Sequence, residues 1–493
     1  MSGRWLNAAV SRSDDVLKVH RLAQAGGSAA LLEWLAAHLG GWVGVVDSEA
    51  EHGRVPEAAV RGAAELTARG VRSAVLHDGD RATLLFALDG PRAPAAVLAA
   101  VLEQPPHPGV TALLADAAVP LALVLRAEEA ERRAERVRRA ELRTREAVLR
   151  LLMSGLLPTA HQIAGALGPT LPDPLRLYVV ECPAGRLAEV GALCRELTGG
   201  RAWIVRCPVY VRHLIVLAPV GPAAGPAAGR PLAGALVEAA PDCTVGVSGE
   251  MCLSEAPVAY TQAFHALAVA RGRPERHARF GPGPELALAA HEAGADWAGT
   301  LLAPLHTYEP RRPQDPGGQE LRATAEAWLN FASHATRLLR IHRNTLAARL
   351  RLIEVLLGLD LARLPDQAAL SLALRLTPGA GRASGTDPEP AGAPGLDEVL
   401  SDPRLTDWAR GHLSGLTGPD APAGARDTVR VWLAHDAQLG PAAAAMGVSV
   451  PGARKRLTRI EALLERSLLQ SPSARYDLWL AHRAEGLAED LAR

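Results

Sequence analysis

The sequence predicts a multidomain protein with two α/β domains joined by a helix and followed by two all-α helix-turn-helix domains. In residues 1–281, short apolar runs bounded by Gly, Asp and Pro alternate with helical segments, as in α/β domains. A highly charged helical stretch interrupts them at 126–150. From residue 297 onward the chain shows helical patterns alone, and one of these patterns occurs twice.

The first domain is expected to cover residues 1–125. Its apolar runs, such as WVGVVD and TLLFAL, are short and end at turn-forming residues, which is typical of buried strands. We expect strands at 42–47, 73–77 and 83–88 and helices at 14–24, 29–39, 91–103 and 109–125.

Residues 126–150 form a charged helix with a weak heptad pattern. The positions at alternating four- and three-residue spacing are Ala130, Ala134, Val137, Glu141, Thr144, Val148 and Leu151. Two of them are polar and the alanines bury little surface, so the seam is weak. It fits a signalling helix that dimerises, and it fits equally a solvated connector held by Glu–Arg pairs along one helix.

Residues 151–281 are predicted to form a second α/β domain that contains all five cysteines. We expect strands at 175–182, 202–206, 213–218 and 243–248 and helices at 187–197 and 255–271. No two cysteines form a CxxC pair, and no His or Cys lies at zinc-finger spacing. We therefore expect buried free thiols, no metal site and no cofactor. A redox sensor is the alternative, but no feature of the sequence supports it.

A helix-turn-helix is predicted within residues 297–377, after a helix at 298–308. A short helix at 334–339 is followed by a turn and by a longer helix from Arg343, with His342 as its N-cap. Its apolar stripe is Leu346, Leu350, Ile353 and Leu357. Gly358 can end this helix in a left-handed conformation, and a further helix follows at 365–376.

The element recurs in residues 396–493. Aligned on the second helix, the matched pairs are Ile341 with Val448, Arg349 with Arg456, Leu350 with Leu457, Ile353 with Ile460, Glu354 with Glu461 and Pro365 with Pro472. Gly447 suits the turn and Ser449 suits an N-cap. Residues 378–395, rich in Pro, Gly and Ala, are expected to be a mobile linker between the copies.

The RNTL helix start, the ARLRLIE body and the LLGLDL tail resemble the C-terminal DNA-binding domain of the PucR/CdaR group of bacterial transcriptional regulators. The resemblance implies a GAF-like sensor domain at 1–125 and a degenerate GGDEF-like domain at 151–281. The latter lacks a GG(D/E)EF loop, so no cyclase activity is expected. Between Trp328 and Ile341 the first copy is about three residues shorter than the family pattern, whereas the second copy keeps the family-like length.

The DNA-binding residues follow from this arrangement. Arg343, Asn344 and Thr345 would face base edges, because Arg pairs with guanine and Asn with adenine in the major groove. In the second copy these positions read Val-Pro-Gly, so phosphate binding or dimer formation is expected there. The remaining candidates are Arg340 and Arg349 for phosphates, His342 and Ser449 at the helix starts, and Arg454, Lys455 and Arg456 in the second copy.

Charge and composition add weaker constraints. The formal net charge is zero, but 321–375 contains eight Arg against four acidic residues, and 426–485 nine Arg and Lys against six. Lys18 and Lys455 are the only lysines, which is typical of a bacterial protein from a GC-rich genome. Neither a signal peptide nor an apolar run of about 18 residues is recognisable, so we expect a cytoplasmic protein with no membrane partner.

Together these features predict a transcriptional regulator that binds double-stranded DNA as a homodimer. Its front domains would sense a small-molecule effector or a partner. A nucleotide cyclase or hydrolase is the first alternative, but phosphate-loop, GxSxG and HExxH motifs are missing from the sequence. The second alternative is a protein-interaction scaffold whose helix-turn-helix units do not read bases.

Overall fold

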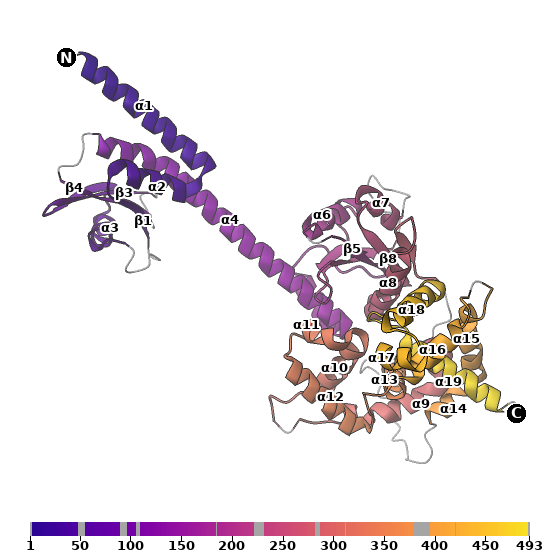
Figure 1. Ribbon diagram of the computed structural model, residues 1–493. Helices are drawn as coiled ribbons and strands as arrows, with labels where there is room; N and C mark the ends of the chain where they lie inside the picture. The colour runs from indigo at the N-terminus through magenta and orange to yellow at the C-terminus, as the bar shows by residue number, and fades with distance from the viewer. Residues whose placement is uncertain are drawn as a thin grey trace. The chain divides into compact units, whose positions relative to one another are not determined.

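The fold comes from a computed structural model, which divides into two compact units, residues 1–140 and 141–493 (Figure 1). One helix, α4 (Val110–Met153), contributes its first part to unit 1 and its last part to unit 2. The structure describes residues 2–47, 55–88, 96–104, 109–183, 185–220, 231–281, 286–310, 312–377, 395–419 and 421–491.

Unit 1 contains a four-stranded antiparallel sheet in the order β1-β4-β3-β2. The strands are β1 (Trp42–Asp47), β2 (Ser73–Asp78), β3 (Arg81–Ala87) and β4 (Ala96–Glu103). The other helices are α1 (Ser2–Ala25), α2 (Gly27–Leu39) and α3 (Glu57–Arg69). Neighbouring side chains of a strand point to opposite faces, so Leu84 packs with α2 and α4 while Leu85 packs with α3. The sheet therefore lies between two helical layers.

Two predictions for unit 1 were wrong. The helix expected at 91–103 is the strand β4 from Ala96 onward, and 91–95 lies outside the described residues. The strand is buried on both faces, so its apolar run lacks the alternation that identifies a one-sided strand, and its alanines favour a helical interpretation. The helices expected at 109–125 and 126–150 are one continuous helix, and α3 was not predicted.

Helix α4 is long and apolar enough over part of its length to cross a membrane, judged by length and composition alone. This is weak evidence, because a core helix passes the same test. Leu113, Leu114, Ala117 and Leu121 of this part are buried in the core of unit 1. The structure thus gives the apolar part of α4 a packing role.

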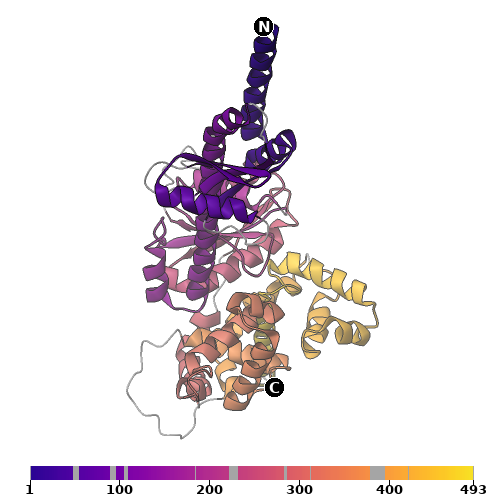
Figure 2. The same cartoon turned by 90° about the vertical axis from the view of Figure 1, so that its left-hand side faces the viewer.

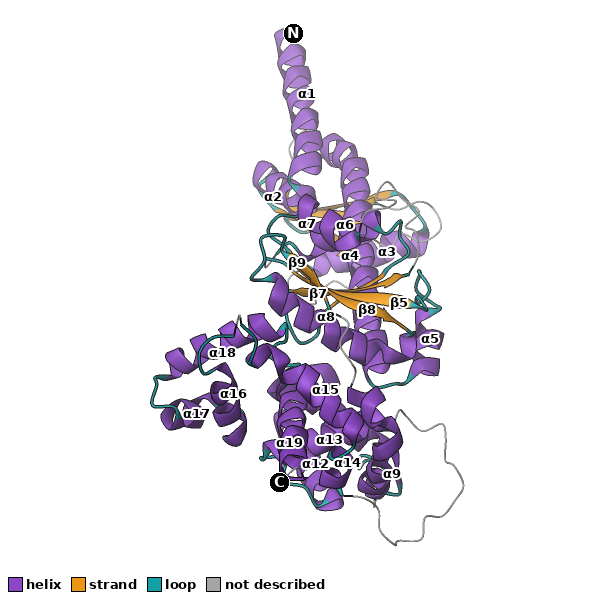
Figure 3. Ribbon diagram, turned by 90° about the vertical axis from the view of Figure 1, so that its right-hand side faces the viewer, coloured by secondary structure: helices purple, strands orange, loops and turns teal. Residues whose placement is uncertain are grey.

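Unit 2 contains a five-stranded sheet in the order β6-β7-β5-β8-β9. Figure 3 shows this sheet with its helices. The strands are β5 (Leu175–Glu181), β6 (Trp203–Arg206), β7 (His213–Pro219), β8 (Thr244–Met251) and β9 (His277–Arg279). All neighbours are antiparallel except β8 and β9. The accompanying helices are α5 (Leu157–Ala164), α6 (Leu187–Leu197), α7 (Leu232–Ala239), the 3-10 turn η1 (Leu253–Glu255) and α8 (Ala256–Ala270). Of these elements, α5, α7 and β9 were not predicted.

Helices α6 and α7 cover one face of this sheet, and α8 with the end of α4 covers the other. Five buried thiols were expected from the sequence. Cys182, Cys194, Cys207 and Cys243 are buried, but Cys252 is exposed because it follows the end of β8.

Helix α8 lies so close to β8 that only glycine fits at position 246. A Cβ atom there would lie 2.0 Å from the carbonyl oxygen of Ala263 and 2.3 Å from the amide nitrogen of Leu267. Both are backbone atoms, so Gly246→Ala is expected to cost about 2–4 kcal/mol of unfolding free energy in urea denaturation. The control is Gly234→Ala in α7, where the nearest atom is 3.9 Å away and a gain of about 0.5–1 kcal/mol is expected. Equal stability of the two variants would contradict this packing.

The remaining helices of unit 2 follow this sheet in the chain. They are α9 (Leu286–His306), α10 (Gly318–Phe331), η2 (Ala332–His334), α11 (Ala335–Leu339), α12 (Arg343–Leu357), α13 (Leu364–Leu376), α14 (Leu396–Leu400), α15 (Pro403–Leu413), η3 (Ser414–Leu416), α16 (Ala425–Ala434), α17 (Leu439–Ala445), α18 (Val450–Leu464) and α19 (Arg475–Leu491). All of them except η2 and α11 contribute buried residues to one hydrophobic core, which joins both predicted copies through α9, α13 and α19. The expected linker lies outside the described residues, except for Gly395.

Candidate nucleic-acid interface

The first helix-turn-helix consists of α11, a short turn and α12. Helix α11 has only five residues and follows a 3-10 turn, which is where the sequence is shortened. Arg340 ends α11 in the left-handed conformation, with φ 54°, and its N–H donates to the Thr336 carbonyl. Helix α12 begins at Arg343 and ends at Gly358, whose φ is 66°. These boundaries confirm the prediction for this helix.

The first turn of α12 presents polar side chains to solvent. The His342 ring accepts a hydrogen bond from the Asn344 N–H at 3.3 Å, so His342 is the N-cap as predicted. Arg343, Asn344 and Thr345 are exposed. Among the residues that the structure describes, none forms an ion pair with Arg343. The three residues expected to contact bases therefore lie at an accessible helix N-terminus.

The two arginines expected to bind phosphates are already engaged within the protein. Arg340 donates to the Glu146 carboxylate on α4 at 3.0 Å. Arg349, only 14% exposed, donates to Glu320 at 2.5 Å and to the Thr324 hydroxyl at 3.3 Å. Both partners are remote in sequence, so sequence reasoning missed them. A phosphate contact by either arginine would have to replace these bonds.

The second helix-turn-helix consists of α17, a turn at Gly447 and α18. Gly447 has φ 64° and occupies the position of Arg340 in the first copy. Ser449 caps α18, since its hydroxyl accepts from the Gly452 N–H at 3.2 Å. Helix α18 projects with α16 and α17 to one side of unit 2 (Figures 2 and 3). Its exposed cations are Arg454, Lys455, Arg456 and Arg459. Within the described part of the chain, none of them forms a salt bridge.

The two copies share hydrogen bonds that the apolar pattern alone does not reveal. The Glu354 carboxylate accepts from the Leu361 N–H at 3.0 Å, and the matched Glu461 accepts from the Leu468 N–H at 2.7 Å. Each bond ties the recognition helix to the loop that follows it. Glu465 takes the left-handed position of Gly358, with φ 52°. The match between Glu354 and Glu461 in the sequence thus corresponds to the same hydrogen bond in the two copies.

The first copy is packed into the middle domain. Phe331, Ala335, Leu338 and Leu346 are buried in one cluster with the last turns of α4 and with α8. The Arg337 guanidinium donates to the Val209 carbonyl at 3.2 Å. The orientation of α12 is therefore fixed by contacts with the middle domain as well as by its own helices.

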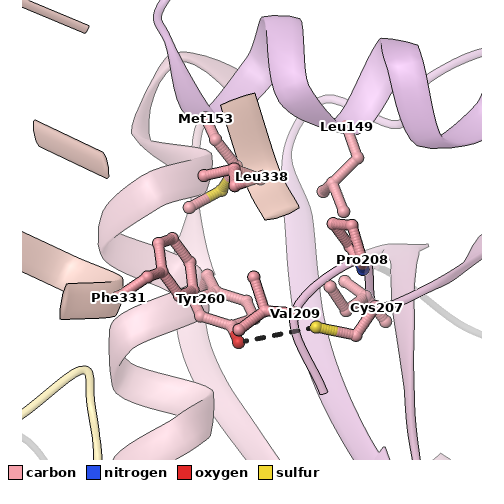
Figure 4. Close-up of a pocket in the computed structure, with 9 residues that line it drawn as sticks. Leu149, Met153, Cys207, Pro208, Val209, Tyr260, Phe331 and Leu338 are labelled. Carbon is pink, nitrogen blue, oxygen red and sulfur yellow. Dashed lines mark hydrogen bonds between the residues drawn. The ribbon is translucent and has the colours of Figure 1, made fainter. Parts of the chain in front are cut away.

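A narrow apolar pocket lies at this junction (Figure 4). Its lining comes from α4, α8, the β6–β7 connection, β7, α10 and α11, and comprises Leu149, Met153, Cys207, Pro208, Val209, Ile215, Tyr260, Phe331 and Leu338. The Tyr260 hydroxyl points toward the Cys207 sulfur at 3.9 Å. Burial raises the pKa of this tyrosine well above its usual value, so it stays neutral. Sequence spacing gave no signal for this pocket.

The second copy is held to the middle domain by polar contacts. The buried His265 ring on α8 accepts from the Ser467 N–H at 3.0 Å. Burial lowers the pKa of His265 to about 3, so the ring is neutral and able to accept this bond near neutral pH. Arg466 stacks over the Phe280 ring at 4.0 Å, and Arg273 pairs with Glu465 at 2.5 Å. The middle domain thus contacts the C-terminal end of α18.

Comparison with known domains agrees with this geometry. The PucR C-terminal helix-turn-helix domain matches residues 321–376 and again 425–484. The chain contains two PucR-type helix-turn-helix domains. The matched ranges hold α12 and α18 together with the helices around them. This finding supports a transcriptional regulator that binds DNA. It also confirms the duplication, which the sequence analysis inferred from the repeated spacing.

Other comparisons add little. No protein with a curated description matches this chain. Among solved structures, the crystal structure of a regulator of polyketide synthase expression from Bifidobacterium adolescentis matches at 19% identity with a TM-score of 0.22. The match covers 47% of this chain and 91% of that chain. A similarity this low supports no argument about fold. Within the described residues, no group of three or more His, Cys, Asp or Glu is placed to hold a metal ion.

Proposed function

We propose that this protein is a dimeric transcriptional regulator in which the first copy reads bases and the second copy binds the DNA backbone. Arg343, Asn344 and Thr345 would enter the major groove, and the cations of α18 would neutralise phosphates. Unit 1 would sense an effector or partner, and the GGDEF-like middle domain would have no catalytic role. Incubation with GTP and magnesium is then expected to give no turnover.

The exposed first turn of α12 is the observation that carries this proposal. A capped helix N-terminus with an Arg and an Asn side by side, turned to solvent and free of internal ion pairs among the described residues, suits base-edge contacts. The exposed cations of α18 supply the complementary, sequence-independent attraction. Helices α12 and α18 pack on one hydrophobic core, so both surfaces belong to the same packed body that would contact DNA.

Selection of genomic DNA fragments by the purified full-length protein tests the proposal. The selection is done at two salt concentrations. A shared motif among the selected fragments, with affinity that falls steeply as salt rises, is the expected result. Fragments without a common motif would show backbone binding alone. Absence of binding at the lower salt concentration would refute DNA recognition by either copy.

The dimer in this proposal rests on an exposed apolar stripe of α4. Ala130, Ala134 and Val137 are exposed, Val137 to 66%. The seam cannot extend to Val148, which is buried in the middle-domain core. Intrahelical pairs such as Arg139 with Glu135 at 2.7 Å support the connector interpretation instead. The association state of the protein in solution distinguishes a dimer contact from a solvated connector.

Val137→Asp is expected to weaken the dimer about tenfold or more, because each subunit would bury a carboxylate in the seam. Analytical ultracentrifugation over a range of concentrations measures this change. Val211→Asp, at a position that is 75% exposed outside the helix, is the matched control and should leave association unchanged. A wild-type protein that stays monomeric throughout would remove α4 as a dimer contact.

A protein-interaction scaffold is the second candidate. It is favoured by the burial of α11 in the middle-domain core and by the internal pairing of Arg340 and Arg349. Under this alternative, α12 and α18 would contact a protein partner. The DNA selection separates the candidates, since a scaffold enriches no motif.

A further inference from the structure

Cys182 and Cys243 meet at the end of two neighbouring strands. Strands β5 and β8 are antiparallel, and the last pair of their ladder is Glu181 with Thr244. One step further along the same register, Cys182 lies opposite Cys243. Both are fully buried in the cluster that contains Val180 and Val245, so the two thiols share one face of the sheet.

The backbone hydrogen bonds of Cys182 show whether Cys182 and Cys243 form a hydrogen-bonded or a non-hydrogen-bonded pair of the antiparallel ladder. Its N–H donates to the Arg212 carbonyl at 2.9 Å, and its carbonyl accepts from the Arg212 guanidinium at 3.3 Å, both toward the β7 side. Toward β8, Cys182 and Cys243 therefore form a non-hydrogen-bonded pair. In such pairs the Cα atoms lie about 4.5 Å apart and the side chains approach most closely. A disulfide requires Cα atoms about 4.4–6.8 Å apart, a range that includes this distance.

The two thiols also interact chemically. A hydrogen bond from Cys243 is the largest influence on the Cys182 thiol and lowers its pKa below the ordinary value, although burial and the nearby Asp242 act in the opposite direction. Arg212 and Arg186 contribute smaller lowering effects. The same bond, together with burial, raises the pKa of Cys243. The thiolate is the form that reacts with oxidants. Cys182 is thus the attacking sulfur and Cys243 the resolving one.

We propose that Cys182 and Cys243 are a redox-active pair that hydrogen peroxide or a similar small peroxide oxidises to an intramolecular disulfide. The Cys182 sulfur attacks one peroxide oxygen, the O–O bond breaks, and a sulfenic acid and one water form. The Cys243 sulfur then attacks the Cys182 sulfur, the S–O bond breaks, and the second water leaves. The two sulfurs lose two electrons, which reduce the peroxide to water.

The other cysteines provide internal controls. Cys194 lies on α6 in the same buried cluster, Cys207 lies on the opposite face of the sheet, and Cys252 is exposed. Cys252 needs to be removed, because no cleavable Arg or Lys separates it from Cys243 and trypsin would leave both in the peptide 213–271. Cys182 lies in the separate peptide 177–186. A Cys252→Ser background therefore makes the mapping unambiguous.

The test treats the native full-length Cys252→Ser protein with peroxide, blocks the remaining thiols and maps disulfide-linked tryptic peptides. The expected result is a link between 177–186 and 213–271, a fall from four free thiols to two, and full reversal by dithiothreitol. Cys194→Ser should keep the link, and Cys243→Ser should abolish it. A link to the Cys194 peptide, or four unchanged thiols in the native protein, would overturn the proposal. The mapping on the parent protein decides the question even if a variant does not fold.

Discussion

The Arg343→Ala, Asn344→Ala double variant is expected to lose about 100-fold or more of the preference for operator over random DNA. Each well-placed bidentate contact to a base supplies about 1–3 kcal/mol of discrimination. Weak, salt-sensitive binding should remain, because the cations of α18 are untouched. Competition binding with operator and scrambled duplexes at fixed salt measures the effect.

The double variant should leave the fold intact. Both side chains are exposed and neither buries surface in the core, so the helix and its His342 cap should persist, which circular dichroism can verify. Arg410→Ala removes a charge elsewhere, at an exposed arginine of α15 that pairs with the exposed Asp407, and should not change the preference. If the double variant discriminates as well as wild type, the first copy is not the reader.

The local features of this interface could be predicted from the sequence. Cap residues, helix-ending glycines and apolar periodicity depend on neighbours within a few positions, so the limits of α12, the His342 cap and the Ser449 cap were correct. Base contact by Arg343, Asn344 and Thr345 stays a prediction.

Long-range pairings could not be predicted. Arg340 meets Glu146, which lies 194 positions earlier, and Arg349 meets Glu320 on a neighbouring helix. Nothing in the spacing of a charged residue indicates which remote carboxylate it contacts. The same limit applies to β4. Its Ala-rich run favours a helix when it is considered alone, but it forms a strand where it packs between two helical layers.

Arg349 and Arg456 occupy matching positions in the two copies but have different roles. The two residues match in the repeat, yet Arg349 is held by Glu320 whereas Arg456 is exposed. Because Arg456 is exposed and forms no ion pair with another described residue, it is available for phosphate, and the backbone-binding test is directed to α18.

Replacing Arg454, Lys455 and Arg456 together by alanine is expected to weaken binding to operator and random DNA alike. Each lost phosphate contact lowers the slope of log affinity against log salt by about 0.9, so the slope should fall by about 2–3 units while base preference is retained. Titrations at several salt concentrations measure the slope.

The matched control replaces three exposed arginines of unit 1, Arg69, Arg72 and Arg81, and should leave the slope unchanged. An unchanged slope in the α18 variant would mean that this helix does not contact the backbone. A loss of motif preference at an unchanged slope would instead make α18 a reader of bases.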